Sequence, residues 1–118
     1  IIANGLCVAE SLAAAEMLAA DGINAKVINM HTIKPLDTEL VIESAKATGK
    51  VVTVEEHSII GGLGSAVCDV LCAKAPTKTM KIGVNDVYGE SGPALELIKR
   101  YGLDGQSIYE KVKAFVQE

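Results

Sequence analysis

The amino-acid sequence predicts an α/β domain, a three-layer arrangement in which helices cover both faces of a mainly parallel sheet. Short β-branched runs alternate with helical patterns along all 118 residues, and this alternation is typical of parallel sheets flanked by helices. The length allows one domain, residues 1–118, with an ordinary hydrophobic core. Hydrophobic residues make up 49% of the chain and aromatic residues only 3%, so aliphatic side chains must form that core.

The first part of the chain contains two predicted strands separated by a helix. Residues 1–3 (Ile-Ile-Ala) form the tail of a strand, and residues 5–21 carry apolar side chains at helical spacing. Gly22 ends this helix at a position where a left-handed residue is favoured. Residues 25–30 then form the next strand.

The middle of the chain repeats this order of elements. Asp37 is the predicted N-cap of a helix that ends at Gly49. Residues 51–54 are β-branched without alternation, which is typical of a strand covered on both faces. A helix from about residue 62 to residue 74 and a strand over residues 80–84 follow.

The last part of the chain begins with a polar, glycine-punctuated loop over residues 85–92. Pro93 occupies a favoured first position of a short helix, which ends at Gly102. Asp104 is the predicted N-cap of a final helix with apolar positions three or four residues apart. The chain contains no repeat or linker, so no second domain is predicted.

Charge and cysteine content narrow the possible partners and compartment. Eleven basic residues face 15 acidic ones, a net charge of −4, which argues against sequence-independent binding of nucleic acid. No apolar stretch approaches the roughly 20 residues that span a bilayer, so we expect no membrane partner. The cysteines, Cys7, Cys68 and Cys72, are odd in number and match no disulfide scaffold. We therefore expect a cytoplasmic protein.

The unusual residues of the sequence follow the central predicted strand, where parallel sheets meet ligands and partners. They are Glu55, Glu56, His57, Gly61, Gly62 and Gly64. One interpretation is an anion-binding turn, because glycines let backbone amides approach closely and a helix N-terminus favours negative charge. The other is a tight turn that packs the helix against the sheet or another subunit. We favour the second, since the neighbouring carboxylates oppose an anion.

No complete catalytic set accompanies these residues. His57 is either a general base or, as we favour, a structural hydrogen-bonding residue. His31 is interpreted as a loop or interface residue. Cys68 and Cys72 lack further ligands for a metal and are not spaced as a redox pair, so they are interpreted as small apolar residues at a shoulder or subunit contact. We predict no catalytic, cofactor-binding or metal-binding residue in this chain.

Four segments give the sequence a specific resemblance to a known family. They are residues 27–37 (VINMHTIKPLD), 54–67 (VEEHSIIGGLGSAV), 88–93 (YGESGP) and 97–104 (LIKRYGLD). In this order and spacing they resemble the C-terminal domain of transketolases, which the chain covers almost completely. Similar third domains occur in 1-deoxyxylulose-5-phosphate synthases and in the β subunits of 2-oxo-acid dehydrogenases, which remain alternatives together with a regulatory module that binds small anions.

The resemblance implies part of a thiamine-diphosphate enzyme that moves two-carbon ketol units between sugar phosphates. In that family the cofactor and its magnesium bind preceding domains through a Gly-Asp-Gly motif, which this sequence lacks. The isolated domain is therefore expected to bind neither group and to be inactive.

The same resemblance implies how the domain is assembled. The expected partners are the N-terminal transketolase domains or subunit, in a homodimeric enzyme that this domain supports. The implied fold is a three-layer α/β/α sandwich on a mixed sheet, whose antiparallel strand precedes the point where this chain starts. We accordingly expect a fragment that lacks this strand and the cofactor-binding domains.

Overall fold

The fold is a four-stranded sheet between two layers of helices, seen in a computed structural model that describes residues 1–31, 35–58, 62–84 and 98–118. The strands are β1 (Ile2–Ala3), β2 (Ile28–Asn29), β3 (Lys50–Ser58) and β4 (Lys78–Val84). Their order in the sheet is β2-β1-β3-β4, and each neighbouring pair is parallel. The α/β class predicted from the alternation is thus confirmed.

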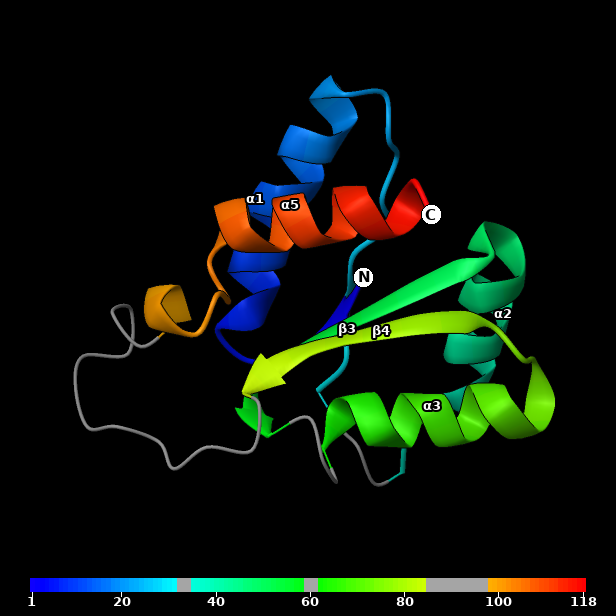
Figure 1. Cartoon of the computed structure of the whole chain (residues 1–118). Helices are drawn as coiled ribbons and strands as arrows, with labels where there is room; N and C mark the ends of the chain where they lie inside the picture. Colours follow the sequence, from blue (N-terminus) through cyan, green and yellow to red (C-terminus); the bar gives the residue numbers. More distant parts are fainter. Residues whose placement is uncertain (32–34, 59–61, 85–97) are drawn as a thin grey trace.

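Helices cover both faces of this sheet (Figure 1). They are α1 (Cys7–Ala20), α2 (Thr38–Thr48), α3 (Leu63–Lys74) and α5 (Gly105–Val116). One hydrophobic cluster joins α1 and α5 to the sheet, and a second cluster joins α2 and α3 to it. The two clusters lie on opposite faces, so the arrangement has three layers. No helix among the described residues is long and apolar enough to cross a membrane.

Alternation along the central strand β3 supplies both clusters. Val51 packs in the cluster with α2 and α3, whereas Val52 and Val54 pack in the cluster with α1 and α5. This is expected because successive side chains of a strand point to opposite faces. Each of these valines is at most 5% exposed, as the uninterrupted β-branched run predicted.

Local sequence determines where several helices begin and end. The Asp37 side chain accepts a hydrogen bond from the Leu40 amide at 3.2 Å and caps α2, and Asp104 caps α5 in the same way through the Ser107 amide. Gly49 ends α2 with a φ of 81°, in the left-handed region. The caps predicted at these two aspartates are confirmed.

Three strands differ from prediction in where they begin or end. β2 is confined to Ile28–Asn29 rather than residues 25–30, because its partner β1 pairs through two residues only. β4 begins at Lys78 rather than residue 80, and β3 continues to Ser58 instead of ending at residue 54. The predicted loop and helix start at residues 85–93 lie outside the described residues, and the antiparallel strand implied before the chain remains a prediction.

Candidate functional site at the carboxyl ends of the strands

Glu55 lies near the end of β3 and is buried, with 1% of its surface exposed. Its carboxylate accepts hydrogen bonds from the amides of Leu63, at 2.9 Å, and Gly64, at 2.7 Å. These amides belong to the first turn of α3, where a helix leaves backbone N–H groups without partners and favours negative charge. Glu55 is therefore a helix cap supplied by the neighbouring strand.

Gly64 lets α3 approach the sheet closely enough for this cap. A Cβ atom at Gly64 would lie 2.8 Å from the Thr53 hydroxyl oxygen and 2.9 Å from Cγ of Lys81. A larger residue would push the helix away from β3 and lengthen both hydrogen bonds to Glu55. Gly64 thus has a packing role, while the function of the glycine-rich turn as a whole stays a prediction.

Glu56 points to the opposite face of the sheet, toward the start of α1. The Leu6 amide donates a hydrogen bond of 3.4 Å to its Oε1 atom, and a Cβ at Gly5 would lie 2.6 Å from the same oxygen. Gly5 has a φ of +57°, which together with this close approach favours glycine. The adjacent glutamates of β3 consequently serve two helices on opposite faces.

A third carboxylate, Glu10 on α1, caps α5 in the same way. Its Oε2 atom accepts a hydrogen bond of 2.8 Å from the amide of Gly105, although 95 residues separate the two in sequence. Gly105 is buried, and a Cβ there would lie 3.0 Å from that of Ala13. This contact is not predictable from the local sequence, because nothing near Glu10 indicates a partner 95 residues away.

These carboxylates also affect the thiol of Cys7, which is fully buried at the start of α1. Burial, followed by the negative charges of Glu56, Glu10 and Glu55, raises the pKa of Cys7 to about 12. The thiolate is the nucleophilic form of cysteine, so Cys7 is unreactive at neutral pH. The other two cysteines lie on α3. Cys68 is half-buried, Cys72 is exposed, and neither forms a disulfide.

The remaining candidate residues are placed only in part. His57 belongs to β3, but its side chain lies outside the described residues, as does all of Gly61. Gly62 is the N-cap residue of α3, and His31 is exposed beyond β2. Within the described ranges no three His, Cys, Asp or Glu residues are grouped as a metal site requires. An anion at the start of α3 would have to displace Glu55.

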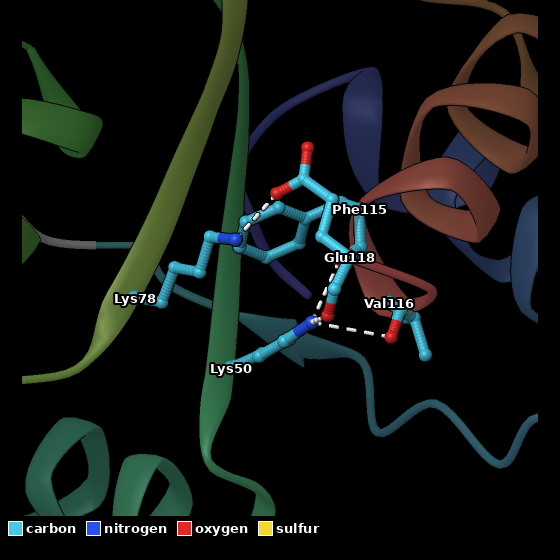
Figure 2. Close-up of polar contacts among 5 residues, drawn as sticks. All are labelled: Lys50, Lys78, Phe115, Val116 and Glu118. Atoms are coloured by element: carbon cyan, nitrogen blue, oxygen red, sulfur yellow. Dashed lines mark hydrogen bonds and ion pairs between the residues drawn. The ribbon is translucent and has the colours of Figure 1, made fainter.

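At the opposite side of the sheet, where the strands begin, two lysines contact residues 115–118 (Figure 2). Nζ of Lys50 donates hydrogen bonds to the backbone carbonyls of Phe115, Val116 and Glu118 at 2.8, 3.1 and 3.1 Å. Lys78 forms an ion pair of 2.5 Å with Glu118. Both ammonium groups lie over the Phe115 ring, 5.3 and 5.5 Å from its centroid. Cations at the C-terminus of a helix complement its dipole.

Beside Lys50 the structure contains a cavity of about 450 Å³. It opens at the amino ends of the strands, between α2 and α5, and most of its lining is aliphatic. The lining comes from β1, the segment before β2, the first residues of β3, and the two helices. No motif in the sequence indicates this cavity, because its lining residues are mostly aliphatic and come from separate segments.

The parallel sheet covered by helices on both faces, with carboxylates that cap helices α3 and α5, defines an α/β domain of the three-layer type. The chain belongs to the transketolase C-terminal domain family, whose model matches residues 1–108. The resemblance found in the loop sequences is thereby confirmed.

Three relatives and solved structures illustrate the match. A protein of Methanocaldococcus jannaschii described as a transketolase C-terminal section is 50% identical over 113 residues, which are 95% of this chain and 35% of the relative. A 6-deoxy-6-sulfo-D-fructose transketolase subunit of Clostridium sp. is 48% identical over 92% of this chain and 34% of its own. A solved structure described as a split-gene transketolase, an inactive β4 tetramer, superposes with a TM-score of 0.89 at 50% identity over 96% of this chain and 37% of that one.

The match extends to enzymes of a second kind. A 1-deoxy-D-xylulose-5-phosphate synthase of Geobacter sulfurreducens is 39% identical over 98% of this chain and 18% of its own. The chain thus spans about a third of the transketolase relatives named above and less of this synthase. It corresponds to one domain of a larger transketolase-like enzyme.

Proposed function

We propose that this chain is the C-terminal domain of an enzyme that transfers two-carbon ketol units between sugar phosphates, and that it supports assembly without taking part in the chemistry. The two transketolase relatives, at 48 and 50% identity, favour this reaction over that of the synthase, at 39%. The observation that carries the structural role is the use of Glu55, which is buried and whose two oxygens each accept a hydrogen bond from a helix amide.

Thiamine diphosphate and magnesium would then bind to other domains of the enzyme. Magnesium requires oxygen ligands, chiefly carboxylates and phosphates. The carboxylates at the carboxyl ends of the described strands, Glu55 and Glu56, each accept a hydrogen bond from a helix amide. The start of α3 is likewise blocked to a diphosphate by the negative charge of Glu55. The described residues therefore do not fit this cofactor.

The partners we propose are the cofactor-binding domains or subunit of the same enzyme, in a homodimer located in the cytoplasm. Free cysteines at positions 7, 68 and 72 fit a reducing compartment. The split-gene transketolase that this chain resembles is described as an inactive β4 tetramer, so at least one relative that contains such a domain forms an oligomer.

Calorimetry tests the non-catalytic role. Thiamine diphosphate with magnesium chloride, titrated into the 118-residue chain, should give no saturable heat, and the chain should not transfer ketol units from a ketose phosphate to an aldose phosphate. Micromolar binding of the cofactor, or measurable transfer, would contradict the proposal.

A second titration separates this role from the anion-binding alternative. Inorganic phosphate added to the isotopically labelled chain should leave the amide resonances of Leu63 and Gly64 unchanged, because Glu55 occupies both N–H groups. Saturable shifts of these two resonances would favour the regulatory module instead.

A further inference from the structure

The side of α1 that faces away from the core is apolar, although it lies at the surface. Leu6, the N-cap residue, is 45% exposed, and Leu12 in the second turn is 53% exposed. A surface helix usually carries polar residues on this side, yet here only one residue is charged. We call this side the outer face of α1, and it comprises the exposed residues Leu6, Ala9, Leu12, Ala13, Glu16, Ala19 and Ala20.

The outer face of α1 is complementary to itself when its direction is reversed. Two copies of the helix, packed antiparallel about a two-fold axis that passes between Leu12 and Ala13, bring each exposed position from Leu6 to Ala19 opposite another exposed position. The facing pairs are Leu6 with Ala19, Ala9 with Glu16, and Leu12 with Ala13. In each pair a large side chain meets an alanine, an alternation that lets two surfaces interdigitate. A two-fold interface between identical chains requires such self-complementarity.

We propose that the outer face of α1 packs against the same face of a second copy of this chain, with the two helices antiparallel. The inference rests on the assembly role proposed above and names the surface that joins two copies. The alanine in each pair lets the helix axes approach to about 8 Å, the short end of the range for packed helices. At this distance Leu6 and Leu12, which are exposed in the single chain, become covered.

Electrostatics favours the antiparallel orientation over the parallel one. Glu16 faces the partner's Ala9, which lies in the first turn of α1, where a helix favours negative charge. The two Glu16 carboxylates are then about 10 Å apart along the helices, because each faces a position seven residues away, and salt screens most of their repulsion at that distance. A parallel pair would bring these carboxylates together, and α1 contains no basic residue to offset them.

Other occupants fit this face less well. A membrane surface attracts helices through basic residues on their polar side, and α1 has none. A surface of another domain need not match the reversed pattern, so such a cover leaves the pairing of each large residue with an alanine unexplained. A single helix pair is smaller than an interface of standard size, so we expect the chain to dimerise weakly, with a dissociation constant on the order of 100 µM.

Sedimentation equilibrium of the 118-residue chain, from about 10 µM to about 1 mM, tests the proposal. Ala9→Glu sets a carboxylate opposite the partner's Glu16 twice in each dimer, so it should raise the dissociation constant about tenfold. Adding Glu16→Lys gives both contacts opposite charges and should return the constant to within about threefold of the original. Ala47→Glu on α2 is the matched control, because Ala47 is also an exposed helical alanine, and it should leave the constant unchanged.

The outcomes separate this interface from the other possible covers. A chain that stays monomeric to about 1 mM would overturn the proposal and assign the face to another domain of the enzyme, and flotation of that monomer with phosphatidylglycerol vesicles would assign it to a membrane. A dimer that Ala9→Glu weakens no more than Ala47→Glu does, or that Glu16→Lys fails to restore, would also overturn it. Binding of thiamine diphosphate in the calorimetric test would contradict the proposed function without changing these constants, so the two failures are distinguishable.

Discussion

The parallel strands all end at one side of the sheet, the carboxyl edge, and all begin at the other, the amino edge. At both edges charged side chains bind the ends of helices, but the charge is negative at the carboxyl edge and positive at the amino edge. At the carboxyl edge Glu55 is 1% exposed and binds two helix amides. At the amino edge Lys50 binds three carbonyls at the end of α5, but it is only half-buried and lies beside an open cavity. The charged group is fully buried at the carboxyl edge and half-buried at the amino edge.

This difference follows from the direction of the helices. Helices that connect parallel strands run opposite to them, so their N-termini gather at the carboxyl edge and their C-termini at the amino edge. The dipoles of all these helices therefore add. Negative side chains are favoured at the carboxyl edge, where the helix N-termini lie, and positive side chains at the amino edge, where the C-termini lie. A carboxylate on a short side chain can meet this need inside the protein, whereas the exposed pair of Lys78 and Glu118 meets it at the surface.

The largest expected effect comes from Glu55→Ala at the carboxyl edge. The variant loses two charge-assisted hydrogen bonds and leaves a buried space, so we expect its free energy of unfolding to fall by about 3 to 4 kcal/mol. Urea denaturation monitored by circular dichroism measures this. Glu56→Ala is the matched control and should cost under ~1 kcal/mol, because Glu56 is half-buried and its hydrogen bond is long. Equal falls in the free energy of unfolding of both variants would mean that the burial and the two short hydrogen bonds of Glu55 add nothing to stability.

The second effect concerns the amino edge and depends on pH. Burial, and then the charge of Lys26, lowers the pKa of the Ile1 amine from 8.0 to about 6. The unfolded chain therefore binds more protons between pH 6 and 8, and stability should rise with pH across this window. We expect a gain of about 3 kcal/mol, at 1.36 kcal/mol for each of the two units of pKa shift. Urea denaturation at several pH values measures it, and acetylation of the amine should abolish the gain.

A smaller loss is expected for Lys50→Met, also at the amino edge. The variant keeps most of the apolar stem but leaves the carbonyls at the end of α5 without their cation, which should cost about 1 to 2 kcal/mol. Lys78→Met serves as the control and should cost under ~1 kcal/mol, since the side chain of Lys78 is 53% exposed and surface ion pairs contribute little. A larger loss for Lys78→Met would mean that the surface pair, rather than Lys50, holds α5.

The smallest effect should be a gain, for Thr53→Val at the carboxyl edge. The Thr53 hydroxyl is fully buried and has no hydrogen-bond partner among the described residues. Valine has nearly the same shape without the polar atom, so the melting temperature should rise, with a gain of about 1 kcal/mol. Ser11→Ala tests the same principle on the opposite face, where Ser11 also has a buried hydroxyl without a partner. Destabilisation by Thr53→Val would indicate a bound water at this hydroxyl.

Sequence reasoning predicted the contacts whose partners are close in the chain. Asp37 and Asp104 each cap an amide three residues further on, so a local pattern was sufficient. Lys50 and Phe115 are 65 residues apart, and Glu10 and Gly105 are 95 apart. Such contacts depend on how elements pack in space, which hydrophobic periodicity does not specify.

The end of β3 shows why the candidate site was only partly predicted. Two consecutive glutamates suggest that a strand has left the core, because buried charges are costly unless paired. Here the cost is offset by helix amides on both faces, so the strand continues through Glu55 and Glu56 to Ser58. The amides that offset it belong to α1 and α3, and only the fold brings both helices to this strand.

The separation of α1 and α5 in sequence has a consequence for synthesis on the ribosome. One core face is built from neighbouring elements, α2 and α3, which emerge between residues 38 and 74. The other joins α1 to α5, which follows α2 and α3 in the sequence. Until α5 has been synthesised, the apolar side of α1 lacks its partner helix, and such exposed apolar surface promotes aggregation. The synthesis of α5 therefore determines when this face of the domain is covered.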